Sequence, residues 1–175
     1  MFFTGLHDSL DEKIKDRLII RVVETKTRDM IDKCLEFIAY EAQYRMPWIV
    51  FDRDQVKDFD KIIDEVKEKG IDIGWSNPCF EIWMYAYFGI MPVIYESWTC
   101  CTEFGKMYVR KTGRKYNKAD NKMYDRLCRN GNEQEAIRIA EQKFQQCFRE
   151  GKKKPSEMCP CTTVYELVRE IRQKK

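Results

Sequence analysis

Two aspartates that directly follow an apolar run have the spacing of a metal-binding pair. Residues 48–51 (Trp-Ile-Val-Phe) are typical of a buried strand, which ends abruptly at Asp52-Arg53-Asp54. In open α/β sheets ligands bind beyond the carboxyl ends of the strands, and a bend after the strand lets both carboxylates reach one cation. Mg²⁺ (or Mn²⁺) suits such a site, because Mg²⁺ binds carboxylate oxygens and keeps waters that a phosphate can displace. Asp52 and Asp54 are therefore predicted to be catalytic metal ligands, although an isolated Asp-x-Asp pair more often lies in a solvated loop.

A second polar group follows the apolar run at 71–73. Ser76 and Asn77 are good N-cap residues for a helix that begins just after them, and the free amides of a helix start favour an anion such as phosphate. Glu81 lies among apolar residues of that helix, where burying its charge is costly unless it is paired or bound to a metal. We expect Ser76 and Asn77 to bind an anion and Glu81 to be catalytic. The alternative for Glu81 is an ion pair with Arg53 or a cap within the helix.

A run of cations without an acid lies further along the chain. Six basic residues occur between positions 106 and 118: Lys106, Arg110, Lys111, Arg114, Lys115 and Lys118. Cations hold phosphates, and the interleaved Tyr108 and Tyr116 can stack on unpaired bases. Beside an acidic metal site this segment predicts a nucleic-acid contact. The alternative is a solvated helix face with both tyrosines packed inward.

The charge is distributed unevenly over the chain. Residues 1–96 contain 13 Lys/Arg and 19 Asp/Glu, a net charge of −6, whereas residues 97–175 contain 19 and 10, a net charge of +9. The composition, with 43% hydrophobic and 35% charged residues, is that of a globular protein. An acidic part joined to a basic part indicates that the basic part holds a polyanion while the acidic part binds a cation. Uneven solvation of two helical surfaces is the alternative.

Several other site classes are disfavoured or excluded. His7 is the only histidine, which excludes a multi-histidine centre. A phosphate-binding glycine-rich loop is missing, so any ATP hydrolysis is expected to come from an ATPase partner. Eight cysteines in a chain without a visible export signal are expected to be reduced. A four-sulfur zinc site would need Cys100, Cys101, Cys159 and Cys161, but their spacing favours incidental thiols.

The apolar stretches indicate a cytoplasmic protein without a membrane segment. The first residues lead straight into a polar, charged run, so no secretory signal is visible. The longest uncharged stretch, 82–95, is shorter than the roughly 20 residues needed to cross a bilayer. We expect this stretch to be a buried helix followed by a turn.

The elements that position the carboxylates alternate between strands and helices up to residue 96. Strands are predicted at 18–23, 48–51 and 71–73, and helices at about 28–44, at 56–66 and from residue 78 onward. Alternation with continuously apolar strands predicts an α/β fold with a parallel sheet covered by helices on both faces. The helix at 28–44 has Ile31, Leu35 and Ala42 on one face.

From residue 97 the pattern becomes helical and basic. Helices are predicted near 101–112, 120–129, 133–149 and 163–173. Asn132 is a predicted N-cap, and Thr163-x-x-Glu166 has the spacing of a capping box. The chain is thus divided into an α/β core, 1–96, and a basic helical extension, 97–175, packed on that core.

Two strings resemble the central block of the RloB-like family, and the resemblance extends over nearly the whole chain. They are Val50-Phe51-Asp52-Arg53-Asp54 and Ser76-Asn77-Pro78-Cys79-Phe80-Glu81-Ile82-Trp83. The family is associated with phage-abortive-infection and restriction loci, often beside an ATPase, and belongs with Toprim-like proteins. The resemblance implies a Toprim-like fold in which Asp52 and Asp54 are the Toprim aspartate pair and Glu81 is a further acidic residue.

Two departures from the family pattern bear on catalysis. The family carries a Glu-Gly-x-x-Thr-Glu stretch on a first strand, and this sequence starts with residues that resemble the helix after it. The sheet is then expected to be thin and open beside the strand that ends at Asp52, an edge that another chain can pair with in a homo- or hetero-oligomer. Tyr87 stands where the family usually has a histidine.

Two function classes follow from these residues. The first is a metal-dependent nuclease subunit of a phage-defence system that cleaves DNA or RNA, with a tRNA-directed effector as a variant of it. The second is a non-catalytic Toprim-like module that binds nucleic acid or an ATPase partner.

Overall fold

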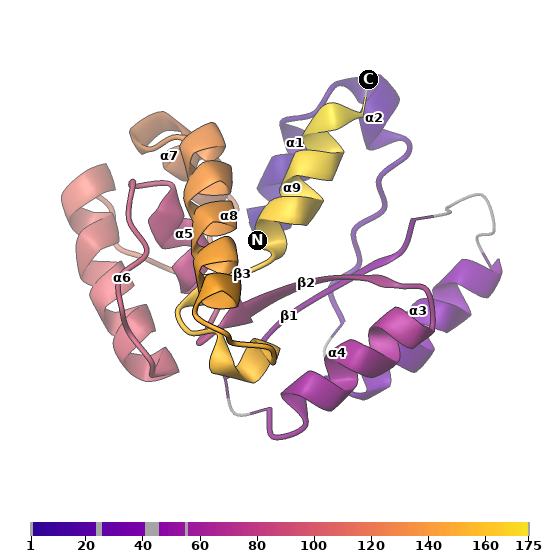
Figure 1. Ribbon diagram of the computed structural model, residues 1–175. Coiled ribbons are helices and arrows are strands. Elements are labelled where there is room, and N and C mark those ends of the chain that lie inside the picture. Colours follow the sequence, from indigo (N-terminus) through magenta and orange to yellow (C-terminus); the bar gives the residue numbers. More distant parts are fainter. Residues whose placement is uncertain (1, 24–25, 41–45, 55, 175) are drawn as a thin grey trace.

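The computed structural model describes residues 2–23, 26–40, 46–54 and 56–174, which form a mixed α/β structure (Figure 1). The helices of the first half are α1 (Phe2–Asp8), α2 (Glu12–Lys15), α3 (Asp29–Tyr40), α4 (Phe59–Glu68) and α5 (Glu81–Ala86). Those of the second half are α6 (Ser97–Thr112), α7 (Met123–Asn130), α8 (Glu133–Arg149), the 3₁₀ turn η1 (Pro155–Glu157) and α9 (Val164–Gln173). The strands are β1 (Trp48–Asp52), β2 (Asp72–Asn77) and β3 (Cys161–Thr162).

The sheet is mixed, with strand order β1-β2-β3. β1 and β2 are parallel, and Asp52 at the end of β1 lies opposite Ser76. On the other side of β2, the short β3 pairs antiparallel through Asn77 and Cys161. The predicted wholly parallel sheet is therefore wrong in its third strand, which comes from the C-terminal part of the chain.

The predicted strand at 18–23 is also wrong, because these residues form no regular element. Ile19 and Val22 are 43% and 80% exposed. A β-branched run favours a strand only where its side chains pack on a half-buried pleated surface, and these two side chains find none. Among the described residues β1 has a strand neighbour on one side only, as expected for a thin sheet.

Helices cover both faces of the sheet, as predicted (Figure 1). On one face Ile49, Ile73 and Trp75 pack into a buried cluster with α3 and α4. On the other face the main core contains α1 and α5 to α9, and it reaches the sheet through Val50. Gly74 of β2 lies close to α9: a Cβ at that position would be in ordinary van der Waals contact with Val164, at 3.6 Å.

The longer helices agree with their apolar periodicity. α4 and α6 to α9 confirm the predicted helices to within a few residues. The helix predicted at 28–44 is confirmed over Asp29–Tyr40, while Ala42 lies outside the described residues. The Asn132 side chain accepts a hydrogen bond from the amide of Glu135 at 2.9 Å, which confirms the predicted cap of α8.

The predicted capping box at Thr163 is wrong. Its hydroxyl accepts a hydrogen bond from the amide of Trp75 at 3.0 Å and donates one to the carbonyl of Ile73 at 3.3 Å. The side chain therefore bonds to β2 rather than to the first turn of α9. Among the described residues, no helix has the length and apolar character needed to span a membrane.

Candidate metal centre at the end of β1

The backbone beyond β1 keeps Asp52 and Asp54 close to the segment that leads into α5. The amide of Phe80 donates to Oδ2 of the half-buried Asp52 at 3.3 Å. The amide of Asp54 donates to the carbonyl of Pro78 at 2.9 Å. Asp54 is exposed and has a φ of +31°, in the left-handed region that aspartate tolerates better than most residues. The bend expected after the strand is thus present.

The charges around Asp52 are predominantly negative. Burial raises the pKa of Asp52 above its ordinary value, and the nearby carboxylates of Glu81 and Asp54 raise it further. The hydrogen bond from Phe80 and the positive charge of Lys118 act in the opposite direction. A divalent cation at this edge would relieve the repulsion between these carboxylates.

Glu81 is 1% exposed, yet its carboxylate is held by two donors. Tyr116 donates its hydroxyl to Oε1 at 2.7 Å, and the Nζ of Lys118 lies 2.9 Å from the same oxygen. Burial acts to raise the pKa of Glu81, but these two hydrogen bonds and the charge of Lys118 outweigh it and leave the pKa below its ordinary value. Glu81 is therefore ionised, while its Oε2 is buried without a hydrogen-bond partner.

The alternative pairing of Glu81 with Arg53 is wrong. The Nη1 of Arg53 donates to the carbonyl of Ser156 at 2.8 Å, so Arg53 ties the end of β1 to η1. The partner of Glu81 is Lys118, from the basic segment that was predicted to contact nucleic acid.

Ser76 and Asn77 do not occupy a helix start, which corrects that part of the prediction. Both residues are the last of β2 and are fully buried. The hydroxyls of Ser76 and Thr162 are 2.9 Å apart, and the side-chain Nδ2 of Asn77 donates to the carbonyls of Pro155 and Ser156 at 3.2 and 3.3 Å. The helix begins only at Glu81, so the geometry on which the anion-binding prediction rested is absent from this segment.

Two sulfur atoms lie close to the carboxylate of Glu81. The Sγ atoms of Cys79 and Cys101 are 3.8 Å apart, and both lie within 4.8 Å of a carboxylate oxygen of Glu81. In the part of the chain that the structure describes, no other three Cys, His, Asp or Glu residues come together in this way. The combination of Cys100 and Cys101 with Cys159 and Cys161 is therefore not formed. The sequence contains the short pattern Cys79-x-Glu81, but no local signal links it to Cys101.

The basic segment forms an exposed surface beside Glu81. Arg110, Lys111, Arg114 and Lys115 are exposed, and Lys106 is exposed and paired with Glu103 at 2.6 Å. A hollow of about 660 Å³ is lined mainly by polar and basic residues of this region: Arg114, Lys115, Tyr116, Asn117, Lys118, Asp120 and Arg126. Of the cations that line it, Lys118 contacts Glu81 and acts on Asp52 through its charge.

The two tyrosines of this segment pack inward, so the prediction that they stack on bases is wrong. Tyr108 is fully buried, and its ring centroid lies 5.8 Å from that of Phe104. The ring of Tyr116 meets Phe104 edge-on at 4.9 Å, and its hydroxyl is bonded to Glu81. The inward alternative describes these side chains correctly.

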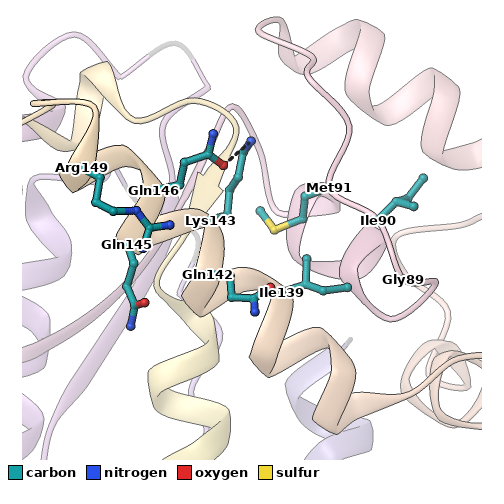
Figure 2. A pocket seen from close by; sticks show the side chains of 9 residues that line it. All are labelled: Gly89, Ile90, Met91, Ile139, Gln142, Lys143, Gln145, Gln146 and Arg149. Atoms are coloured by element: carbon teal, nitrogen blue, oxygen red, sulfur yellow. Dashed lines mark hydrogen bonds between the residues drawn. The ribbon is translucent and has the colours of Figure 1, made fainter.

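A second hollow, of about 450 Å³, lies between α8 and the segment after α5 (Figure 2). Glutamines, Lys143 and Arg149 line it together with Gly89, Ile90, Met91 and Ile139. It contains neither a carboxylate nor any of the predicted site residues. This hollow is therefore separate from the predicted site.

Comparison with known proteins identifies a family. The sequence model of the family described as RloB-like protein matches residues 2–171, which is nearly the whole chain. Neither a curated protein nor a solved structure matches.

Proposed function

Because the chain belongs to the RloB-like protein family, we propose that it is a cytoplasmic, metal-dependent nuclease subunit of a bacterial phage-defence system. It would cleave phosphodiester bonds of DNA or RNA with a Toprim-type site. The observation that carries the proposal is the pair Asp52 and Asp54 at the carboxyl end of β1, near Glu81 and its partner Lys118.

The residues present fit a hard divalent cation. Asp52 and Asp54 are close enough for the charge of Asp54 to raise the pKa of Asp52. Mg²⁺ commonly takes one or two carboxylates and completes its shell with waters and substrate phosphates, so this pair is sufficient in number. The bound ion would activate water and neutralise charge on the scissile phosphodiester.

Glu81 would act through its partner in this site. Its Oε1 holds Lys118 at 2.9 Å, and the side chain of Lys118 is 67% exposed. An ammonium group fixed beside the aspartates can contact a phosphate next to the scissile one. The exposed Arg110, Lys111, Arg114 and Lys115 would hold the flanking strand, so binding should weaken steeply as salt rises.

A second candidate function is a non-catalytic module that binds nucleic acid or an ATPase partner. Two observations favour it. Among the described residues, Cys79, Glu81 and Cys101 have ligand atoms within 4.8 Å of one another, but Asp52 and Asp54 have no third ligand at such distances. The outer edge of β1 has no strand neighbour in the described chain, and such an edge can pair with another chain.

The first prediction tests the aspartate pair. Wild type should bind Mn²⁺ or Mg²⁺ in calorimetric titrations and cleave a panel of single- and double-stranded DNA and RNA. Asp52→Asn and Asp54→Asn should weaken metal binding by more than about tenfold and reduce cleavage to background. Asp64→Asn, on the exposed face of α4, removes the same charge elsewhere and should change neither.

Three outcomes separate the candidates. Loss of binding and cleavage in both site variants supports the nuclease. Metal or nucleic-acid binding without cleavage by wild type supports the binding module. Wild type that binds neither metal nor nucleic acid would contradict both functions.

A further inference from the structure

The side chains of Cys79, Glu81 and Cys101 form a compact group, and the proposed nuclease chemistry does not use its two sulfurs. Cys79 immediately precedes the turn into α5, Glu81 is the first residue of α5, and Cys101 lies near the start of α6. Cys79 and Glu81 are 2% and 1% exposed, and Cys101 is half-buried. The three ligand-type atoms lie within 4.8 Å of one another.

The spacing of the two sulfurs is the spacing that a tetrahedral metal requires. With Zn–S bonds of about 2.3 Å and a tetrahedral angle, two thiolates on one zinc ion are about 3.8 Å apart. The Sγ atoms of Cys79 and Cys101 are 3.8 Å apart. A disulfide needs about 2.05 Å, so these sulfurs are not in a bonded arrangement.

The carboxylate is held so that one oxygen remains for a ligand. Oε1 of Glu81 accepts from Tyr116 and Lys118, while Oε2 is buried and has no hydrogen-bond partner. A buried carboxylate oxygen without a partner is unfavourable, and coordination to a metal would satisfy it. Donors to the non-coordinating oxygen orient a ligand in this way at many metal sites.

The charges also balance. Two thiolates and one carboxylate exceed the charge of a divalent ion by one, and Lys118 supplies the missing positive charge 2.9 Å from Glu81. A buried group that sums to zero in this way avoids the penalty of an uncompensated charge.

We propose that Cys79, Cys101 and Glu81 bind one thiophilic divalent ion, Zn²⁺ in the first place, with a fourth position left for water. The ion would join the start of α5 to the start of α6. Because the amide of Phe80 holds Asp52, it would also fix the position of the edge that bears Asp52. The site shares no ligand with the aspartate pair, so it can exist whether or not the chain is a nuclease.

The test uses the full chain, metal analysis and cobalt spectroscopy. Protein purified from zinc-supplemented medium without chelators should contain one Zn²⁺ per chain. The stripped, reduced protein should take up one Co²⁺ with thiolate-to-cobalt charge-transfer bands and the visible bands of a tetrahedral ion. Cys101→Ser, Cys79→Ser and Glu81→Gln should each weaken Co²⁺ binding by at least about tenfold, and the two serine variants should also weaken the charge-transfer bands.

Matched variants distinguish ligation from a general loss of structure. Cys128→Ser replaces an exposed cysteine of α7 and should leave zinc content and spectrum unchanged. Asp52→Asn should also leave them unchanged, although it is expected to remove Mg²⁺ binding. Tyr116→Phe removes a donor to Glu81 without removing a ligand, so affinity should fall about 10- to 100-fold while the tetrahedral spectrum persists.

Two results would overturn the proposal. One is a stripped wild type that binds Zn²⁺ and Co²⁺ no more tightly than Cys101→Ser does, with both proteins folded by circular dichroism. Because Cys101 is only half-buried, this comparison remains valid even where serine at the buried Cys79 prevents folding. The other is protein purified from zinc-supplemented medium that contains no Zn²⁺ and whose Cys79 and Cys101 are joined by a disulfide.

Discussion

Glu81 combines a hydrophobic setting with a full negative charge. The side chain is almost completely buried, and Tyr116 and Lys118 keep it ionised by bonding to one oxygen. That charge acts on Asp52, whose pKa it helps to raise. The charges of Glu81 and Asp54 therefore both act on Asp52, although Glu81 belongs to α5 and Asp52 to β1.

The raised pKa of Asp52 predicts a pH-dependent effect of Asp52→Asn on stability. Between the ordinary aspartate pKa of the unfolded chain, about 3.9, and the higher folded value, the native state holds more protons than the unfolded state. The free energy of unfolding of wild type therefore decreases as the pH rises through this window. Asp52→Asn should be more stable than wild type at pH 7, and this advantage should disappear near pH 3.

Urea unfolding of both proteins in metal-free buffer, at several pH values from 3 to 7, measures this difference. Asp64→Asn controls for the removal of one negative charge from an exposed position. An advantage of Asp52→Asn that is the same at every pH would show that titration of Asp52 is not its cause.

At single positions, the sequence predicted residue types better than partners. It identified Asp52, Asp54 and Glu81 because carboxylates beside apolar strands and in apolar helices are conspicuous. It did not predict that Glu81 pairs with Lys118 or lies against Cys79 and Cys101, since these contacts join distant segments. Whether the three carboxylates are catalytic stays a prediction.

At the scale of elements, the N-terminus of α8 provides a direct test of local stabilisation. The side chain of Asn132 accepts from the amide of Glu135 at 2.9 Å. Asn132→Ala removes the only atom that makes this cap, so the protein should lose about 1 kcal/mol of stability. Asn132→Asp retains an acceptor and should lose much less. Chemical denaturation of the three proteins checks the order, and equal stability of wild type and Asn132→Ala would contradict the role of the cap.

Elements with many periodic residues were predicted well, and short ones were not. α8 and α9 present apolar faces over several turns, and the helical spacing of these apolar residues can be recognised in a single sequence. β3 consists of two residues, too few to show any alternation. Thr163 has the sequence of a cap, but its hydroxyl bonds to β2. Tertiary contacts decided both cases.

At the scale of the whole molecule, one carboxylate joins four helical regions. Glu133 at the start of α8 accepts from Tyr87, which follows α5, at 2.9 Å and from Tyr124 of α7 at 2.6 Å. Arg172 of α9 lies 2.7 Å from its other oxygen. Tyr87 is fully buried and its pKa is raised well above the ordinary value, first by burial. Its role here is to donate a hydrogen bond.

Glu133→Gln should therefore destabilise the protein by about 1.5–3 kcal/mol, the range for hydrogen bonds to charged groups. The amide keeps the shape of the side chain but leaves the partly buried Arg172 without its charged partner. Glu135→Gln is the matched control two residues along the same helix, because the side chain of Glu135 forms an exposed ion pair with Arg138. The control should change stability by less than about 0.5 kcal/mol. Similar losses in both variants, measured by thermal or urea unfolding, would contradict the central position of Glu133.

The pairing of β2 with β3 has a consequence for protein synthesis. The hydroxyl of Ser76 meets that of Thr162, which the ribosome adds 86 residues later. Until then the nascent chain has β2 without its antiparallel neighbour and without the hydroxyl of Thr163, which accepts from the amide of Trp75. Contacts this distant in sequence form late in folding, since a long loop must close first. Chains released before residue 163 therefore lack the strand pairing beside Ser76 and Asn77, and only a product that includes residues 161–163 can form it.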